Sequence, residues 1–437
     1  MYKLEYILIV AMLIVTILFY EIGILSDSIM SVLYIVYFAF IMLLFKDCLN
    51  KSKSFFICSF LLLFFQASEL ISCIVAEITN SPLLEVGEVA KINGTSLYLM
   101  LYQLLFFGSA YRMYNEKKIN VNKHVYNVSE NTILNIFTII IMLILIIILL
   151  VYGIPLFMNI SRFAYWSNVV PWYAKKIYLL FIPLALCLGM MSNHKRYFNF
   201  MLLFFMCVIS VLFGDKFSTN LQILYWFIIG WSLQNARYKE LLKFGLKKWV
   251  ILILGIITLF LLISYHYFSI SGTFTGFLGI YLRIAAQGQL FYEVIDKGIV
   301  NNEALIRELS NFFVLKPEIE KIGIFELMRQ FTIIDIDFAL AQGSRASMGY
   351  PAIIIYYLGI IPGCLATVGF GLLFGKFIDI LSISIMNDNM YILVLYQRIY
   401  ILIIEAFNMG NLYRLFSFEL LILIMSIYIL KKVRVVK

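Results

Sequence analysis

Long apolar stretches separated by polar connections dominate the chain. Twelve stretches approach the roughly 20 residues that a helix needs to cross hydrocarbon, some of them shorter. They are residues 4–20, 29–45, 55–76, 95–111, 131–152, 177–191, 198–213, 221–236, 249–268, 351–375, 390–407 and 414–430. Because a membrane-spanning segment must satisfy its own backbone polar groups, the pattern predicts an all-α integral membrane protein with about 12 transmembrane helices.

The polar connections are unequal in length. Residues 269–350, between the ninth and tenth stretches, form a large loop, and residues 153–176 form a smaller one. Within the large loop, helical spacing predicts one short helix and then a second that starts near Pro317 and ends near Phe331. The apolar residues that mark the first helix are Ala304, Leu305, Leu309, Phe312 and Phe313. We therefore expect residues 1–437 to form a single polytopic membrane domain with one large helical loop.

Composition and charge fit this topology. The chain is 63% hydrophobic and 14% charged, against about 25% charged in soluble domains. Most of the 34 Lys and Arg residues lie in alternate connections and at the two termini. The positive-inside rule then places both termini in the cytoplasm and both long loops on the opposite side. The net charge of +9 is thus explained by topology, without a nucleic-acid partner.

Common chemical motifs are absent from the sequence. Six cysteines have neither a CxxC pair nor neighbouring histidines, so disulfides and structural zinc are not expected. The sequence contains no P-loop, HExxH or GxSxG motif. We expect no cofactor and no metal.

The segment RIAAQGQLFYEVID, residues 283–296, is unusually polar for this chain. Helical spacing places Arg283 and Gln287 on one face, and Gln289, Glu293 and Asp296 on another. One interpretation is an interfacial helix whose polar side chains are solvated. The other is that Arg283 binds an anionic headgroup or pyrophosphate, because a guanidinium matches phosphate oxygens.

A second arginine stands in AQGSRASMGYP, where Gly343 and Gly349 flank Arg345. Glycines allow backbone amides to approach a ligand closely, so this segment is either an anion cradle or a hinge anchored to lipid. The smaller loop contributes Arg162 beside Tyr165 and Trp166. These aromatics form either an interfacial belt or a sugar-stacking surface.

Other ionisable residues are candidates for proton transfer or pairing. His266, at the end of the ninth stretch, and Asp215, beside Lys216, are candidate general bases together with Glu293. Three more ionisable residues lie inside apolar stretches, where each is either functional or paired with another helix. They are Glu69, Arg398 and Glu405.

The twelve stretches, the late external loop and the segments RIAAQGQLFYEVID and GSRASMGYPAIIIYYLGIIPG resemble the O-antigen polymerases (Wzy-type) of Gram-negative bacteria. The RX10G pattern of that family is missing, because the eleventh residue after Arg162, Arg283 and Arg345 is Tyr173, Val294 and Tyr356. The resemblance therefore implies a role for arginines in the external loops, but the RX10G motif itself is not shared.

The resemblance implies a GT-C-like membrane glycosyltransferase of the bacterial inner membrane, with its active site facing the periplasm. It would polymerise repeat units linked to undecaprenyl pyrophosphate, among membrane lipids and with a chain-length regulator as a partner. Arg283 and Arg345 would hold the donor pyrophosphate, and Asp215, His266 or Glu293 would be the base. Substrate contacts would come from Arg162, Gln287, Gln289, Arg398, Tyr165 and Trp166.

Two other functions stay open. A lipid-linked oligosaccharide flippase would also have about twelve spans, with short external loops and central charges. An O-antigen ligase would share the topology and use a lipid A core acceptor.

Overall fold

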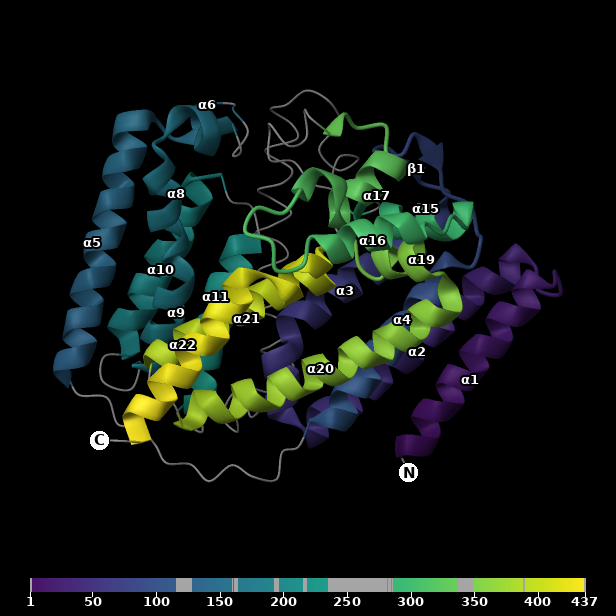
Figure 1. Ribbon diagram of the computed structural model, residues 1–437, viewed down its shortest axis with the longest axis horizontal. Coiled ribbons are helices and arrows are strands. Elements are labelled where there is room, and N and C mark those ends of the chain that lie inside the picture. The colour runs from purple at the N-terminus through teal and green to yellow at the C-terminus, as the bar shows by residue number, and fades with distance from the viewer. Residues whose placement is uncertain are drawn as a thin grey trace. The chain divides into compact units, whose positions relative to one another are not determined.

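The computed structural model describes residues 2–114, 128–158, 160, 164–191, 196–214, 218–234, 281, 284, 286–336, 349–387 and 390–435. These residues are helical apart from turns and one two-stranded hairpin (Figure 1). The chain divides into two compact units. Unit 1 comprises Met1–Lys118, Tyr281–Leu381 and Arg398–Lys437, and unit 2 comprises Ile119–Ile280 and Ser382–Gln397.

Six of the described helices are long and apolar enough to cross a membrane. They are Asp27–Lys51, Lys53–Thr79, Ser129–Tyr152, Trp172–Met190, Ile360–Ile385 and Met390–Phe407. The predicted all-α, multi-pass membrane character is confirmed at this level. The number of twelve spans stays a prediction, and the ninth predicted span lies outside the described residues.

Unit 1 is built from long helices. They are α1 (Tyr2–Glu21), α2 (Asp27–Lys51), α3 (Lys53–Thr79), α4 (Thr95–Met113), most of α20 (Ile360–Asn387), the second half of α21 (Met390–Phe407) and α22 (Phe418–Val435). Side chains added at Gly371 or Gly375 of α20 would collide with the α4 backbone at Phe106 and Ala110. Small residues four apart allow two membrane helices to approach this closely.

A layer of short elements lies at the end of unit 1 where α3 ends and α4 begins (Figure 1). We call this layer the cap. It contains β1 (Pro82–Leu83), β2 (Glu88–Val89), α15 (Gln289–Lys297), α16 (Asn302–Ser310), α17 (Gly323–Phe331), α19 (Ala352–Leu358) and the 3-10 turns Ala286–Gly288, Ile319–Lys321 and Leu412–Phe416.

Both helices predicted inside the large loop exist, with different bounds. The first, α16, ends at Ser310, so Phe312 and Phe313 lie beyond it, and Phe313 has a positive φ of 57°. The second one starts at Gly323 instead of near Pro317, because residues 319–321 form a separate 3-10 turn. The first backbone amide of α17 is held by a distant side chain, since Gly323 N donates to Glu308 Oε2 at 2.8 Å. A start fixed by tertiary contacts cannot be located from local sequence signals.

Unit 2 contains α5 (Val128–Tyr152), α6 (Pro155–Met158), the π-helical turn Tyr165–Val169, α8 (Trp172–Leu179), α9 (Phe181–Met190), α10 (Arg196–Leu212) and α11 (Ser218–Gln234). Helices α9 and α11 are in close contact, because Gly189 and Gly230 each face the backbone of the other helix. The predicted span 177–191 is interrupted at Leu180. Pro183 explains the break, since it has no N–H to donate to the carbonyl four residues earlier.

Candidate functional site

Five predicted site residues lie outside the described residues: Arg162, Asp215, His266, Arg283 and Arg345. Their roles stay predictions. The structure does describe the points at which the segments carrying Arg283 and Arg345 rejoin the helices of unit 1.

The segment that carries Arg283 is anchored to α3. Gly288 N donates to Ser72 Oγ at 2.8 Å, and Cys73 Sγ donates to Gly288 O at 3.6 Å. A side chain at position 288 would collide with Cys73 Sγ, so this contact requires glycine. Gln287 is half-buried in the 3-10 turn, and α15 begins only at Gln289. The α-helical spacing predicted through Gln287 is therefore replaced by a 3-10 turn before α15 begins.

The segment that carries Arg345 re-enters the described structure at Gly349. A side chain at Gly349 would crowd the carbonyl oxygen of Met409, so two backbones cross closely here. The next residue, Tyr350, is buried, with its ring 5.8 Å from that of Phe106 and 5.3 Å from that of Phe407. These contacts hold the residues that follow Arg345 against α4 and the end of α21.

Helix α3 links the two anchoring points. Gln66 Nε2 donates to Phe407 O at 3.0 Å, one turn along α3 from Glu69, whose carbonyl faces Gly288. We use the term α3 junction for residues 66–73, 286–288, 349–350 and 407–410. Glu69 lies within it, is 0% exposed and has no hydrogen-bond partner for either carboxylate oxygen. Within the described part of the chain, Glu69 is not paired with another helix, which was one interpretation of this residue.

Helix α15 packs its polar face against the connection between α3 and α4. Gln289 bonds with the side chain of Glu85, and Asp296 accepts from Asn93 Nδ2 at 3.0 Å. Gln289 is buried, which excludes the interpretation of this helix as one with only solvated polar residues. Because Gln289 is already hydrogen-bonded within the cap, its predicted role in substrate binding gains no support from this geometry.

Glu293 is the predicted base that the structure describes. Its side chain is 1% exposed, and its Oε1 has no hydrogen-bond partner in the regions that the structure describes. Burial, assisted by the charge of Glu88, raises its pKa to about 7, while Lys297, with Nζ 3.9 Å from Oε2, opposes the shift. A carboxyl group with a pKa near 7 can both accept and release a proton at neutral pH.

Glu308 ties four elements of the cap together. Its carboxylate accepts from Gly323 N at 2.8 Å, Tyr413 N at 2.7 Å and Tyr357 Oη at 3.0 Å. Burial raises the pKa of Glu308, and these hydrogen bonds counteract the shift. With its acceptors occupied by the protein, Glu308 serves the architecture of the cap.

The charged residues of α21 are paired with other elements, as expected for interhelical pairing. Arg398 Nε lies 2.6 Å from Glu419 Oε1 on α22, and Arg414 Nε lies 2.7 Å from Glu405 Oε2. Arg414 Nη1 also approaches Glu419 Oε2 at 3.8 Å, which joins the two pairs. Arg398 therefore has a structural role that competes with its predicted substrate contact.

The aromatic pair of the smaller loop packs inside unit 2. Tyr165 donates to Gly153 O at 2.8 Å, and the Trp166 ring stacks on Phe213 at 4.9 Å. Both side chains are buried, whereas Trp172 is 77% exposed. In this arrangement Trp172 presents the larger free surface for a sugar or for lipid.

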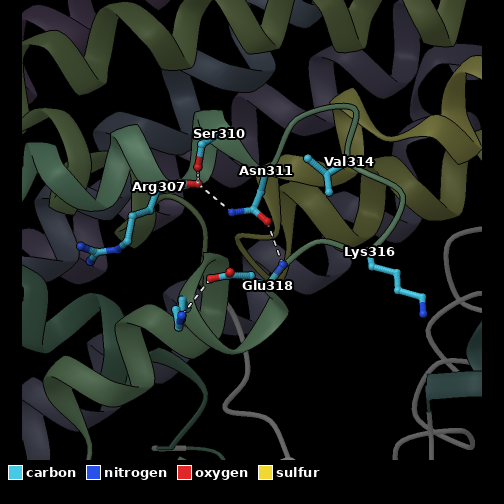
Figure 2. A pocket seen from close by; sticks show the side chains of 7 residues that line it. Arg307, Ser310, Asn311, Val314, Lys316 and Glu318 are labelled. Carbon is cyan, nitrogen blue, oxygen red and sulfur yellow. Dashed lines mark hydrogen bonds and ion pairs between the residues drawn. The ribbon is translucent and has the colours of Figure 1, made fainter.

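A polar cup of about 260 Å³ lies on the loop between α16 and α17 (Figure 2). Its lining residues are Arg307, Ser310, Asn311, Val314, Lys316, Glu318 and Lys321. Asn311 at its centre donates to Arg307 O at 2.9 Å and accepts from Glu318 N at 2.7 Å. Its amide is thus used by the loop itself, and Arg307 Nη2 lies 2.7 Å from Glu326 Oε1. Because these polar groups bond to one another, we interpret the cup as a stabilised turn and not as a ligand site.

Sequence reasoning missed the hydrogen-bonded carboxylates of Glu77 and Glu308, and the amides of Gln66 and Asn408 at the α3 junction. The only local signal for Gln66 is an amide three residues before Glu69 inside an apolar stretch. The partners of Glu77, Glu308 and Gln66 are distant in the chain or in another connection. Their importance becomes visible only once the helices are assembled.

Comparison with known protein families gives a match to part of the chain. Residues 317–424 match a family of unknown function, DUF6418. The matched part includes Arg345, helices α17 and α19, and the Asn408 turn of the α3 junction. No curated protein and no solved structure matches the chain.

Proposed function

We propose that the chain is a membrane glycosyltransferase that polymerises oligosaccharide repeat units carried on undecaprenyl pyrophosphate. In this proposal it acts as an O-antigen polymerase at the periplasmic face of a bacterial inner membrane. The multi-pass helical character and the folded cap are compatible with that role. The observation that carries the proposal is the anchoring of the Arg283 and Arg345 segments within the α3 junction, the first against Cys73 and the second against Met409.

The proposed reaction breaks the bond between the anomeric carbon of the donor glycan and a pyrophosphate oxygen. A new bond forms from that carbon to a hydroxyl oxygen of the acceptor sugar. The bonding electrons leave with the lipid pyrophosphate, and the hydroxyl proton passes to a protein base. This chemistry requires cations at the leaving group and a base at the acceptor.

Arg283 and Arg345 supply the cations in this proposal, because their segments enter the α3 junction from two parts of the chain. Arg162 helps to position the acceptor. The base is one of Asp215, His266 and Glu293. Glu293 has a suitable pKa of about 7, although its side chain is 1% exposed and the acceptor would have to reach it inside the cap.

The test replaces each arginine in a strain that lacks the chromosomal copy. We expect Arg283→Ala and Arg345→Ala to lower polymerisation on the order of 100-fold or more, since each removes a donor to developing charge. Lys316→Ala is the matched control, because it removes an exposed cation of the same large loop. Gel ladders of lipopolysaccharide measure chain length. Full-length ladders from both arginine variants, at normal expression, would rule out this assignment.

Glu69 favours a flippase as the second candidate, because a buried carboxylate without a partner in a membrane helix is typical of transport sites. A deletion strain separates the candidates. Loss of a polymerase leaves core capped with one repeat unit, and loss of a ligase leaves bare core with polymer still on the lipid carrier. Loss of a flippase leaves bare core with untransported precursor.

A further inference from the structure

Four buried acceptor oxygens at the α3 junction have no hydrogen-bond partner among the described residues. They are Gln66 Oε1, both carboxylate oxygens of Glu69, and Asn408 Oδ1. The three side chains are 2%, 0% and 6% exposed. We call these four atoms the oxygen cluster.

The amide of Gln66 connects α3 with the end of α21. Gln66 and Glu69 are three positions apart on α3, so they share a face of that helix. Gln66 Nε2 donates to Phe407 O at 3.0 Å, which puts the Gln66 amide at the last residue of α21. Asn408 is the next residue in the chain. The end of α21 also directs the negative end of its helix dipole towards this point.

A proton alone does not satisfy the oxygen cluster. An ionised carboxylate buried without a partner is very costly, so Glu69 needs either a proton or a cation. Protonation would create one donor and would leave the other acceptors unpaired, each at a cost. A metal cation is attracted to all four oxygens at once, and hard cations prefer oxygen ligands.

We propose that Glu69, Gln66 and Asn408 bind a sodium ion between α3 and the end of α21. One carboxylate with two neutral amides carries a single negative charge, which matches a monovalent cation. A divalent ion would leave an uncompensated charge in an apolar environment. Among the described residues, no Lys, Arg or His pairs with Glu69. This inference does not depend on the proposed glycosyl transfer.

Bound sodium would join the parts of the α3 junction into one rigid element. The residues after Arg345 and the residues after Arg283 both contact this region, through Met409 and Cys73. Sodium occupancy would therefore stabilise the folded chain and its two arginine-bearing segments together.

The first test measures thermal unfolding of the purified full chain in detergent at fixed pH and ionic strength. Sodium chloride is compared with the chloride of N-methyl-D-glucamine, a cation too large for the site. We expect sodium to raise the midpoint by several degrees, because a ligand that binds only the folded state stabilises it. Glu69→Gln, which keeps the side-chain size and removes the charge, should abolish this rise.

Asn135→Leu is the matched control. Asn135 is a buried amide of unit 2 whose side-chain atoms also lack partners, and no buried carboxylate is found among the described residues of that unit. The sodium-dependent rise should persist in this variant. Equal midpoints in the two salts for the wild-type chain would overturn the proposal, as would an undiminished sodium effect in Glu69→Gln.

A second measurement uses the wild-type chain and so does not depend on a folded variant. A hydrophobic carbodiimide modifies buried protonated carboxylates, and mass spectrometry locates the modified residue. We expect Glu69 to be modified in the N-methyl-D-glucamine salt and to be protected by sodium. Absent modification, or modification that sodium does not slow, would overturn the sodium site. Sodium protection combined with full ladders from the arginine variants would support the site and reject the proposed reaction roles.

Discussion

Two carboxylates on one helix have opposite environments. Glu77, near the end of α3, accepts from Tyr34 Oη at 2.7 Å, Asn93 N at 3.1 Å and Ser96 N at 2.8 Å. The carboxylate of Glu69, eight residues earlier and about 12 Å along the helix, makes no hydrogen bond with any described residue. Both side chains are fully buried.

The difference comes from what each carboxylate meets. Glu77 faces the first turn of α4, where free backbone amides and a positive helix end favour an anion. No donor among the described residues reaches Glu69. The backbone amides of Asn408, Gly410 and Asn411 at the end of α21 already bond within their own turn. Burial is the same for both carboxylates. What differs is whether hydrogen-bond donors lie within reach of the carboxylate oxygens.

The largest expected effect is on folding stability and tests this contrast directly. Glu77→Gln replaces an acceptor oxygen by an amide group that faces existing donors, so we expect a loss of about 2 kcal/mol. Glu69→Gln should change stability by less than about 1 kcal/mol in sodium-free buffer, because no hydrogen bond is lost. Thermal unfolding of the two variants in detergent measures both. Equal losses would contradict the contrast.

A smaller effect is expected from pH at Glu293, whose environment lies between these extremes. Its pKa rises from an ordinary 4.5 to about 7 on folding, so the folded state favours the protonated acid. Stability should therefore fall as pH increases from about 4.5 to about 7 and should not fall further above that range because of this group. Glu293→Gln should reduce the slope of the unfolding midpoint against pH. An unchanged slope would show that Glu293 does not titrate in this window.

The smallest effect is expected at a carboxylate that is paired but partly exposed. Arg398 and Glu419 are 43% and 37% exposed, so their ion pair should contribute less than about 1 kcal/mol. A double-mutant cycle of Arg398→Gln and Glu419→Gln measures the coupling energy. A coupling well above that figure would indicate that the network with Arg414 and Glu405 acts as a unit.

Much of the fold could be predicted from apolar length alone. Long apolar runs define α2, α3 and α5, and helical spacing found α16 because its pattern is local. The start of α17 and the packing of α15 on the hairpin depend on contacts made by Glu308 and Glu85 from elsewhere in the chain. Such contacts leave no periodic signal.

Only part of the candidate site could be predicted from the sequence. In the sequence, Glu69 stands out as a charged residue inside an apolar stretch. In the structure, its buried carboxylate has no partner among the described residues. Gln66 and Asn408 are ordinary polar residues until the helices bring them together. Their separation of more than 300 residues hides the relation between them.

That separation also sets an order of events during synthesis. All the partners of Glu77 lie within the first 96 residues, so its site can form soon after α4 has been made. Asn408 is translated about 340 residues after Glu69, which takes roughly half a minute at about 5–20 residues per second. Throughout that interval α3 must reside in the bilayer with an incomplete environment around Glu69. The nascent helix would therefore insert with this residue in its neutral acid form, and the charge would develop only when the last helices arrive.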